Sequence, residues 1–284
     1  MTDFLHEATS PFLLFDELPS SYTEHPFSPF ALTDAFIQEA GEKKQPIMHF
    51  WTTSKQIILG MLDTKLPYLN DALRVFSSYD YAYMVRNSGG LAVVSDEGVL
   101  NFSIFFPEGE ARLSINEGYE RMHHILQEAF ASYGKTIHAY EISDSYCPGD
   151  FDLSIDGKKI AGIAQRRLRG GIAIMIYLSV HGDQKKRADM IRAFYDVGLK
   201  QKETKWDFPP VRPEVMTTLE EALGVPLTIE QTKENIQHVF TKAGIELIQG
   251  DLTPTIQKAY EEGFEKMVKR NNKMLPSSPH SANG

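Results

Sequence analysis

The chain has a single cysteine, Cys147, and its neighbours make it a candidate nucleophile. A proline and a glycine follow it within residues 145–150, which predicts a loop. Most unpaired cysteines are small buried apolar side chains, whereas catalytic residues often lie on loops that a rigid scaffold holds. A thiol on such a loop could attack a carbonyl carbon and carry a covalent intermediate. Cys147 is therefore the first candidate catalytic residue.

A lysine pair lies further along the chain, in the basic stretch 158–171. Lys158 and Lys159 follow Asp156 and Gly157, and an Asp-Gly pair is the strongest short signal for a β-hairpin. Neighbouring residues of a strand face opposite sides, so one of the two lysines must point inward. A buried ammonium needs a partner or a chemical role, and an ammonium close to a thiol favours the thiolate. A solvent-exposed basic strand is the alternative interpretation.

A glycine-rich segment at residues 86–92 joins two apolar stretches. Ser88, Gly89 and Gly90 leave room for backbone N–H groups to approach a ligand, because the glycines have no Cβ. Arg86, just before them, could hold a carboxylate or phosphate. A plain glycine-rich turn would explain the same residues.

Composition and charge narrow the function classes. The 284 residues are 42% hydrophobic and 24% charged, as in globular proteins, and the net charge of −9 argues against a uniformly basic nucleic-acid protein. A lone cysteine excludes an internal disulfide and a multi-thiolate zinc site, and it fits the reducing cytoplasm. No apolar run approaches ~18 residues, and no signal peptide is recognisable. We expect a cytoplasmic protein with no metal, nucleic-acid or membrane partner.

The pattern of apolar residues and turn signals predicts the elements that position these side chains. Helices are expected from Ser28-Pro29 onward, with Ser28 as the N-cap, and over 117–133, 184–199, 217–224, 228–243 and 254–270. A capping box of Thr228 and Gln231 opens the helix at 228–243. Strands are expected over 47–51, 56–60, 82–86 and 171–180, with hairpins joining 91–94 to 99–106 and turning at Asp156-Gly157. Residues 1–26 are expected to form an irregular arm, 203–216 a stiff connector, everything after it helices, and the tail from Pro276 a frayed end. Paired strands with grouped helices and no regular βαβ alternation indicate an α+β fold.

Two of these segments together resemble the lipoate/biotin protein ligase superfamily, over about residues 45–250. The family carries R-R-x-S-G-G-G-A-V-Y-H-D-x-G-N-L-N beside its acyl pocket, and residues 85–101 here read V-R-N-S-G-G-L-A-V-V-S-D-E-G-V-L-N. The family segment K-[IV]-x-G-x-A is matched by K-I-A-G-I-A at 159–164. The resemblance implies mixed sheets with flanking helices, as in the family's catalytic domain, plus a small helical C-terminal part. It predicts an arm and helix at 1–44, a catalytic domain at 45–250, and a helix and tail at 251–284.

The resemblance also implies a site. Cys147 and Lys159 are expected to be catalytic. The residues expected to bind the acyl substrate are Arg86, Ser88, Gly89, Gly90, Ala92, Asn101, Gly162 and Ala164. No metal and no cofactor is expected.

The chain departs from the family pattern at positions 91, 85 and 95, and the first two of these departures argue against the use of ATP. Leu91 replaces the third glycine and crowds the approach to an acyl-adenylate, Val85 replaces a cationic arginine, and Ser95 replaces a histidine. Residues 145–154, together with 165–167, most resemble the octanoyl-GcvH:protein N-octanoyltransferase branch, whose members carry the acyl group on a cysteine.

This branch implies that Cys147 takes octanoyl from a lysine of the glycine-cleavage H protein and passes it to a lysine of the lipoyl domains of 2-oxoacid dehydrogenases. Three alternatives stay open: an octanoyl-acyl carrier protein donor, an ATP-dependent lipoate ligase, and a non-catalytic lipoyl-domain binding protein. Arg166, Arg167 and Arg169 are expected either to dock an acidic carrier domain or to form a solvated basic face.

Overall fold

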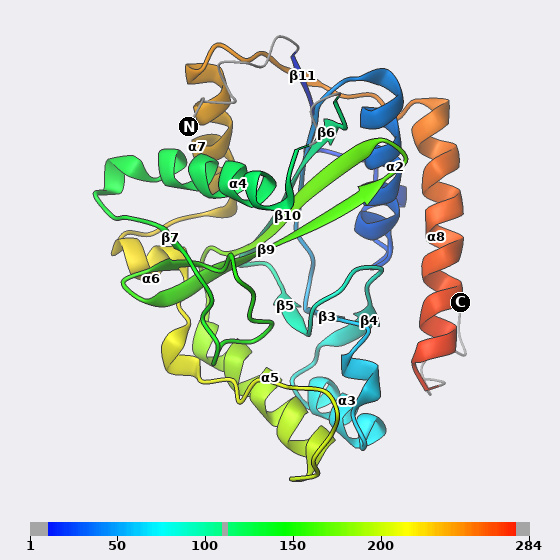
Figure 1. Ribbon diagram of the computed structural model, residues 1–284, viewed down its shortest axis with the longest axis vertical. Coiled ribbons are helices and arrows are strands. Elements are labelled where there is room, and N and C mark those ends of the chain that lie inside the picture. Colours follow the sequence, from blue (N-terminus) through cyan, green and yellow to red (C-terminus); the bar gives the residue numbers. More distant parts are fainter. Residues whose placement is uncertain (1–10, 110–112, 277–284) are drawn as a thin grey trace.

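Two β-sheets with helices packed around them make up the fold (Figure 1). The computed structural model describes residues 11–109 and 113–276. The larger sheet has eight strands and the smaller has three, and the fold is α+β, as the sequence predicts. Residues 1–10 of the expected arm and the tail beyond Pro276, expected to be frayed, lie outside the described residues.

The larger sheet is organised around a long antiparallel ladder. Strand β10 (Gly171–Ser179) pairs antiparallel with β6 (Val99–Pro107) on one side and with β9 (Lys158–Leu168) on the other. Helices cover both faces, so β10 is a nearly unbroken apolar run. Shorter strands extend the sheet: β2 (Ile47–Trp51), β1 (Phe12–Phe15) and β11 (Leu247–Gln249) beyond β6, and β8 (Leu153–Ile155) and β7 (His138–Ala139) beyond β9.

The hairpin predicted at Asp156-Gly157 is confirmed between β8 and β9. Asp156 and Gly157 have φ values of 49° and 78°. Positive φ at both central residues is what a two-residue type I′ turn requires, and Asp-Gly tolerates it well. This turn sets the register that brings Lys159 into the protein interior.

The predicted hairpin between residues 91–94 and 99–106 is wrong. Strand β5 (Val93–Ser95) belongs to the smaller sheet, where it pairs antiparallel with β3 (Gln56–Leu59), and β4 (Ala82–Val85) pairs parallel on the other side of β3. Strand β6 belongs to the larger sheet, so the chain changes sheets at the turn between them.

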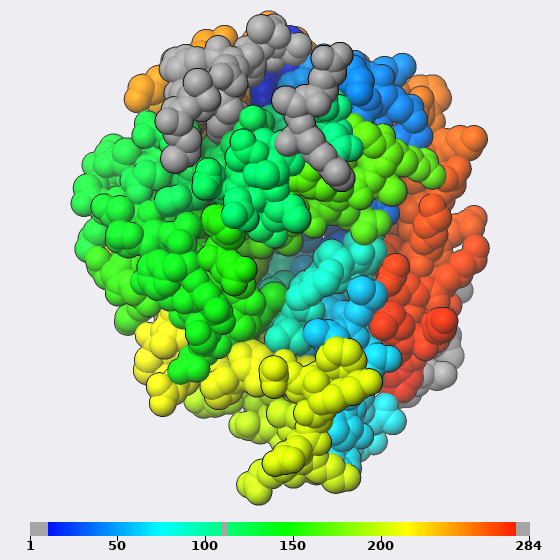
Figure 2. Space-filling view, in the orientation of Figure 1, coloured from blue at the N-terminus to red at the C-terminus, as the bar shows by residue number. Residues whose placement is uncertain are grey.

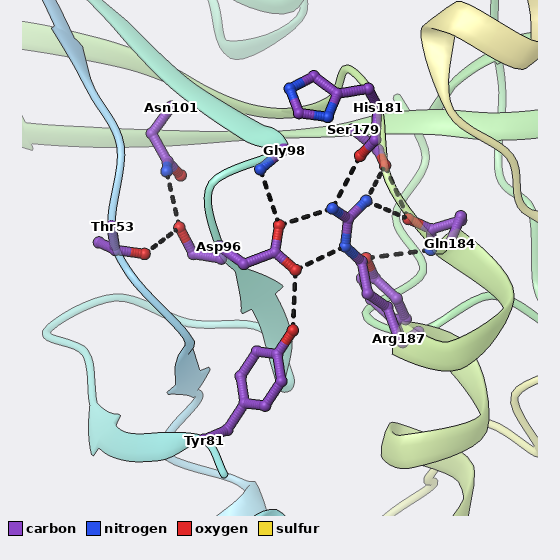
Figure 3. Close-up of polar contacts among 11 residues, drawn as sticks. Thr53, Tyr81, Asp96, Gly98, Asn101, Ser179, His181, Gln184 and Arg187 are labelled. Carbon is purple, nitrogen blue, oxygen red and sulfur yellow. Dashed lines mark hydrogen bonds and ion pairs between the residues drawn. The ribbon is translucent and has the colours of Figure 1, made fainter. Parts of the chain in front are cut away.

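A buried ion pair explains why the chain changes sheets at this turn (Figure 3). The Asp96 carboxylate accepts the Gly98 N–H at 3.0 Å and pairs with Arg187 at 2.6 Å. Arg187 lies on α5 (Gln184–Leu199), so the turn is tied to this helix and not folded back on itself. The sequence around Asp96 shows nothing of this partner, which lies 91 residues away.

Helices cover the two faces of the larger sheet. On one face, α2 (Ser28–Lys43) packs against Phe105 and Ala173, and α8 (Pro254–Met274) lies beside it (Figure 1). On the other face, Ile104 and Ile174 pack with α4 (Ile115–Ala129), α7 (Ile229–Lys242) and the short α6 (Leu219–Leu223). Successive strand residues point to opposite faces, which is why these neighbouring pairs enter different cores.

The smaller sheet shares a core with α5 and with α3 (Leu69–Ser78), a helix that the sequence analysis does not predict. Phe76 of α3 stacks on Phe194 of α5 with ring centroids 4.6 Å apart. This core supports the strands that enter and leave the glycine-rich segment 86–92.

The structure corrects three further expectations: an irregular N-terminal arm, an entirely helical C-terminal part, and Ser28 as the N-cap of its helix. The arm contains β1, which pairs parallel with β2 and β11, so the C-terminal part is not entirely helical. The connector 203–216 includes a short 3₁₀ turn, Pro213–Val215. Ser28 is the first residue of α2 and not its cap, and its hydroxyl lies 2.8 Å from the Tyr260 hydroxyl of α8.

Candidate active site

A cavity of about 340 Å³ lies between the larger sheet, the glycine-rich segment and the loop that carries Cys147. Figure 2 shows a hollow at this place, between the cyan segment and the green one. Much of its wall is apolar and comes from both sheets and from α2: Phe30, Trp51, Ile58, Val93, Met175 and Ile176. A concave apolar site with a few polar groups at one side suits a small ligand with an apolar body.

Cys147 lines this cavity and is only partly buried. Its φ is 47°, a left-handed conformation that residues other than glycine adopt at a cost. The sulfur accepts the Leu91 N–H at 3.2 Å and lies 3.8 Å from Nη2 of Arg86. Both groups favour negative charge on the sulfur, and thiolate is the reactive form of cysteine.

Lys159 is the inward member of the lysine pair: it is fully buried, whereas Lys158 is exposed. This confirms the prediction that one of the two points inward. Its ammonium pairs with Oδ1 of Asp152 at 2.9 Å. Burial raises the pKa of Asp152, and the Lys159 charge opposes that rise.

The same ammonium holds the backbone of the cysteine loop. Lys159 Nζ donates to the carbonyl oxygens of Cys147, at 2.9 Å, and Tyr146, at 3.0 Å, and to the Ser145 hydroxyl at 3.1 Å. Lys159 therefore touches Cys147 through the carbonyl oxygen of that residue. A buried cation with these acceptors fixes three consecutive residues of the loop.

Arg86 organises the glycine-rich segment from within. Its guanidinium donates to the Gly89 carbonyl from Nη2 at 2.7 Å and from Nε at 3.0 Å, and to the Ile58 carbonyl from Nη1 at 3.3 Å. Gly90 has a φ of 88°, and a Cβ there would lie 2.4 Å from Arg86 Nη2 and 3.1 Å from the Cys147 sulfur. Glycine at position 90 is therefore required for this close packing.

Of the remaining residues predicted to bind substrate, four line the same cavity and Ala92 does not. The lining includes Ser88, Asn101, Gly162 and Ala164. A Cβ on Gly162 would lie 2.8 Å from the Tyr177 ring, so glycine leaves room for that ring. Ala92 is fully buried, and its N–H donates to the Tyr195 hydroxyl at 3.3 Å.

Sequence reasoning missed a clamp on the rim of the site. Arg166 on β9 binds Asp34 of α2 at 2.6 Å and donates to the Asn87 carbonyl at 3.0 Å. It thus joins the glycine-rich segment to α2. Asp34 is 132 residues from Arg166 in sequence, and no motif spacing connects them.

The other two arginines considered for carrier docking also contact side chains of this chain. Arg167 lies 3.9 Å from Glu108, and Arg169 donates to Gln38 of α2. The Arg166 guanidinium already binds Asp34 and the Asn87 carbonyl, so it has fewer N–H groups left to bind a partner protein.

A buried polar network supports the cysteine loop through Tyr146, and Figure 3 shows the part of this network around Asp96 and Arg187. The Tyr146 ring is fully buried, and its hydroxyl accepts from Nε2 of Gln184 at 3.3 Å. Gln184 also accepts from Ser179, which Arg187 contacts at 3.0 Å. The residue before Cys147 is therefore anchored to the network that includes the Arg187–Asp96 pair.

Within residues 11–109 and 113–276, no group of three or more histidine, cysteine, aspartate and glutamate side chains could hold a metal ion. No helix in the same ranges is long and apolar enough to cross a membrane.

Comparisons with known proteins agree with the two sequence motifs. A family model described as the lipoyl protein ligase A/B catalytic domain matches residues 25–241. The chain is 41% identical over 258 residues to the octanoyl-[GcvH]:protein N-octanoyltransferase of Macrococcus caseolyticus, covering 89% of this chain and 94% of that one. It is 38% identical over 247 residues to the lipoyl-[GcvH]:protein N-lipoyltransferase of Listeria monocytogenes, covering 87% and 89%. Its fold matches the crystal structure of lipoate-protein ligase A bound with ATP, with a TM-score of 0.68, 19% identity, and coverage of 91% and 95%.

Proposed function

This chain belongs to the lipoyl protein ligase A/B catalytic-domain family, and from that premise we propose that it is an octanoyltransferase. It moves octanoyl from a lysine of the glycine-cleavage H protein to a lysine of the lipoyl domains of 2-oxoacid dehydrogenases. The observation that carries the proposal is the Cys147 sulfur in the wall of an apolar cavity, with the Leu91 N–H donating to it.

The first half-reaction makes a thioester. The Cys147 sulfur attacks the carbonyl carbon of the octanoyl-lysine amide, a C–S bond forms and the C–N bond breaks. The proton of the thiol ends on the departing lysine amine, so protons and electrons balance. Backbone N–H groups of residues 86–92 stabilise the oxyanion that forms on the way, and the apolar wall holds the acyl chain.

The second half-reaction reverses the first with a different amine. The lysine of a lipoyl domain attacks the thioester, its amide forms, and a proton returns to the sulfur. Lys159 holds the Cys147 carbonyl during both steps and serves as the acid and base that moves this proton.

No ATP is needed for this exchange, because one amide is replaced by another of the same kind. Val85 is buried in β4, so position 85 offers no cation to a phosphate. The catalytic thiol must stay reduced between turnovers, which a reducing cytoplasm allows.

The experiment is intact mass spectrometry of the pure protein after mixing with octanoylated H protein and no ATP. We expect a gain of one octanoyl group that hydroxylamine removes and that Cys147→Ala does not acquire. Adding a lipoyl domain should then transfer the octanoyl group to that domain. Lipoylated H protein, tested in parallel, measures how far the cavity discriminates between the two acyl groups.

Each alternative predicts a different result. An adduct from octanoyl-acyl carrier protein, with none from H protein, would show that acyl carrier protein is the donor. Lipoate transfer that needs ATP and survives in Cys147→Ala would overturn the thioester in favour of a ligase. Binding of the lipoyl domain with no adduct from any donor would support the non-catalytic binding protein.

A further inference from the structure

A buried carboxylate and phenol lie behind the glycine-rich segment, outside the lining of the cavity. Asp63 follows β3 in a 3₁₀ turn (Asp63–Lys65) and is fully buried, and Tyr195 on α5 is 2% exposed. The Tyr195 hydroxyl donates to Oδ1 of Asp63 at 2.9 Å, and Oδ2 of Asp63 accepts the Gly60 N–H at 2.7 Å. The pair thus joins the end of β3 to α5.

The direction of these hydrogen bonds is set by chemistry. A phenol has one proton, and here it goes to the carboxylate, which leaves the phenol oxygen free to accept the Ala92 N–H at 3.3 Å. Burial raises the pKa of Tyr195 well above its usual value, so the hydroxyl keeps its proton. Burial raises the pKa of Asp63 to about 6, so the carboxylate is ionised at pH 8.

The next N–H along the chain points to the catalytic sulfur. Leu91 N–H donates to Cys147 at 3.2 Å, and Ala92 N–H donates to Tyr195 on the other side. Two consecutive N–H groups with different acceptors fix the intervening peptide. The segment is also held at Gly60, where a Cβ would lie 1.8 Å from the Gly90 carbonyl oxygen. Asp63 therefore holds Gly60, which packs against the segment at Gly90, and it reaches Ala92 of the segment through Tyr195.

We propose that Asp63 and Tyr195 are positioning residues that keep the Leu91 N–H aimed at the Cys147 sulfur. The inference rests on the proposed function, in which this sulfur is the nucleophile. An N–H that donates to a thiolate makes a charge-assisted hydrogen bond, which is stronger than one to a neutral thiol. When the peptide moves, a thiolate at this position loses part of this stabilisation.

The test is the rate at which iodoacetamide alkylates the folded protein, followed by intact mass from pH 6 to pH 10. Cys147 is the only cysteine of the chain, so the label reports on one sulfur. We expect Tyr195→Phe to lower the rate at pH 7 about fivefold, the worth of one ordinary hydrogen bond, and to shift the pH–rate profile upward. Arg86 and Lys159 are present in every variant compared.

Tyr260→Phe is the matched control. The Tyr260 hydroxyl lies 2.8 Å from the Ser28 hydroxyl, and neither residue lines the cavity. It should change the alkylation rate by less than about twofold, although it also removes a tyrosine hydrogen bond. Asp63→Asn is the second variant: it keeps the Tyr195 oxygen as acceptor for Ala92 N–H, so its rate should lie between those of the wild type and Tyr195→Phe.

A merely structural role predicts something else. Tyr195→Phe would then melt at a lower temperature but alkylate with the pH profile of the wild type, and that result would overturn the proposal. If the positioning role holds, kcat for octanoyl transfer falls and KM for H protein stays the same. Alkylation needs no acyl donor, so it tests the positioning role even if the wild-type protein accepts no octanoyl group, which is how the proposed function itself would fail.

Discussion

Removal of the Lys159 ammonium should destabilise the protein more than most single changes. Lys159 and Asp152 are 0% and 2% exposed and form an ion pair of 2.9 Å. In Lys159→Met the Asp152 carboxylate stays buried without its cation, and the carbonyl oxygens of Cys147 and Tyr146 lose their donor. Breaking one side of a buried ion pair costs about 3–5 kcal/mol.

Thermal unfolding followed by circular dichroism measures this cost. For a chain of this size, a loss of 1 kcal/mol lowers Tm by about 2–4 °C, so Lys159→Met should lower it by roughly 6–20 °C. Lys158→Met is the matched control, since Lys158 is the exposed neighbour on the same strand. Its effect should stay within about 0.5 kcal/mol.

A second substitution separates the buried charge from the lost packing. Asp152→Asn in the Lys159→Met background replaces the unpaired carboxylate with a neutral amide. The amide oxygen can still accept the Ile142 and Gly149 N–H groups that Asp152 binds. We expect the double variant to regain about 2 kcal/mol over Lys159→Met at pH 8.

The stability loss of Lys159→Met should depend on pH, because it leaves the Asp152 carboxyl group buried without its cation. Without Lys159, burial raises the pKa of Asp152 further, so the folded state takes up a proton that the unfolded state releases. The deficit of Lys159→Met relative to the wild type should therefore be larger at pH 8 than at pH 5. The reasoning is refuted if Lys159→Met has the same Tm as Lys158→Met, or if the double variant is less stable than Lys159→Met alone.

Two further predictions concern the glycine-rich segment. Gly60→Ala places a Cβ 1.8 Å from the Gly90 carbonyl oxygen, so the segment must move; octanoyl transfer should fall roughly 100-fold, because a displacement near 1 Å at a reacting group has that effect. Steady-state kinetics measures it, and a rate near that of the wild type would show that the segment does not need this position. For Asp63, burial raises the pKa from 3.8 to about 6, so its stabilising contribution is complete below pH 3.8 and is lost as pH rises through 6. Asp63→Asn has no carboxyl group to titrate at this position, so its free energy of unfolding should rise by up to about 3 kcal/mol relative to that of the wild type between pH 4 and pH 8. Thermal melts across that range measure this difference, and a difference that stays constant with pH would contradict the assignment.

Local signals predicted those elements whose geometry is decided within a few residues. The Asp156-Gly157 turn, the apolar strand β10 and the α7 capping box from Thr228 to Gln231 are all present in the structure. The α8 start is present too, since the Thr253 hydroxyl caps the helix before Pro254. Each of these depends on turn chemistry, hydrophobic period or capping, which adjacent residues determine.

The errors arise where a distant partner decides the outcome. The stretch around Asp96 reads as a hairpin, but Arg187 draws the carboxylate toward α5 and separates β5 from β6. Strands β1 and β11 are three or four residues long, too short for an alternating pattern, and exist because they pair with each other and with β2. The same limit hid the Arg166–Asp34 clamp and the Tyr195–Asp63 pair, whose members are both 132 residues apart.

Each of the three residues that depart from the family's sequence pattern fits its surroundings in this structure. Val85 is fully buried, a place where an arginine would need its own partners. Ser95 is fully buried as well, and its hydroxyl accepts from Asn101 at 3.0 Å and from Thr53 at 2.8 Å. Leu91 contributes its N–H to the Cys147 sulfur. Two of the three thus sit in the interior and the third serves the thiol, so the residues that differ from the ligase pattern are consistent with acyl transfer through Cys147 and without a nucleotide.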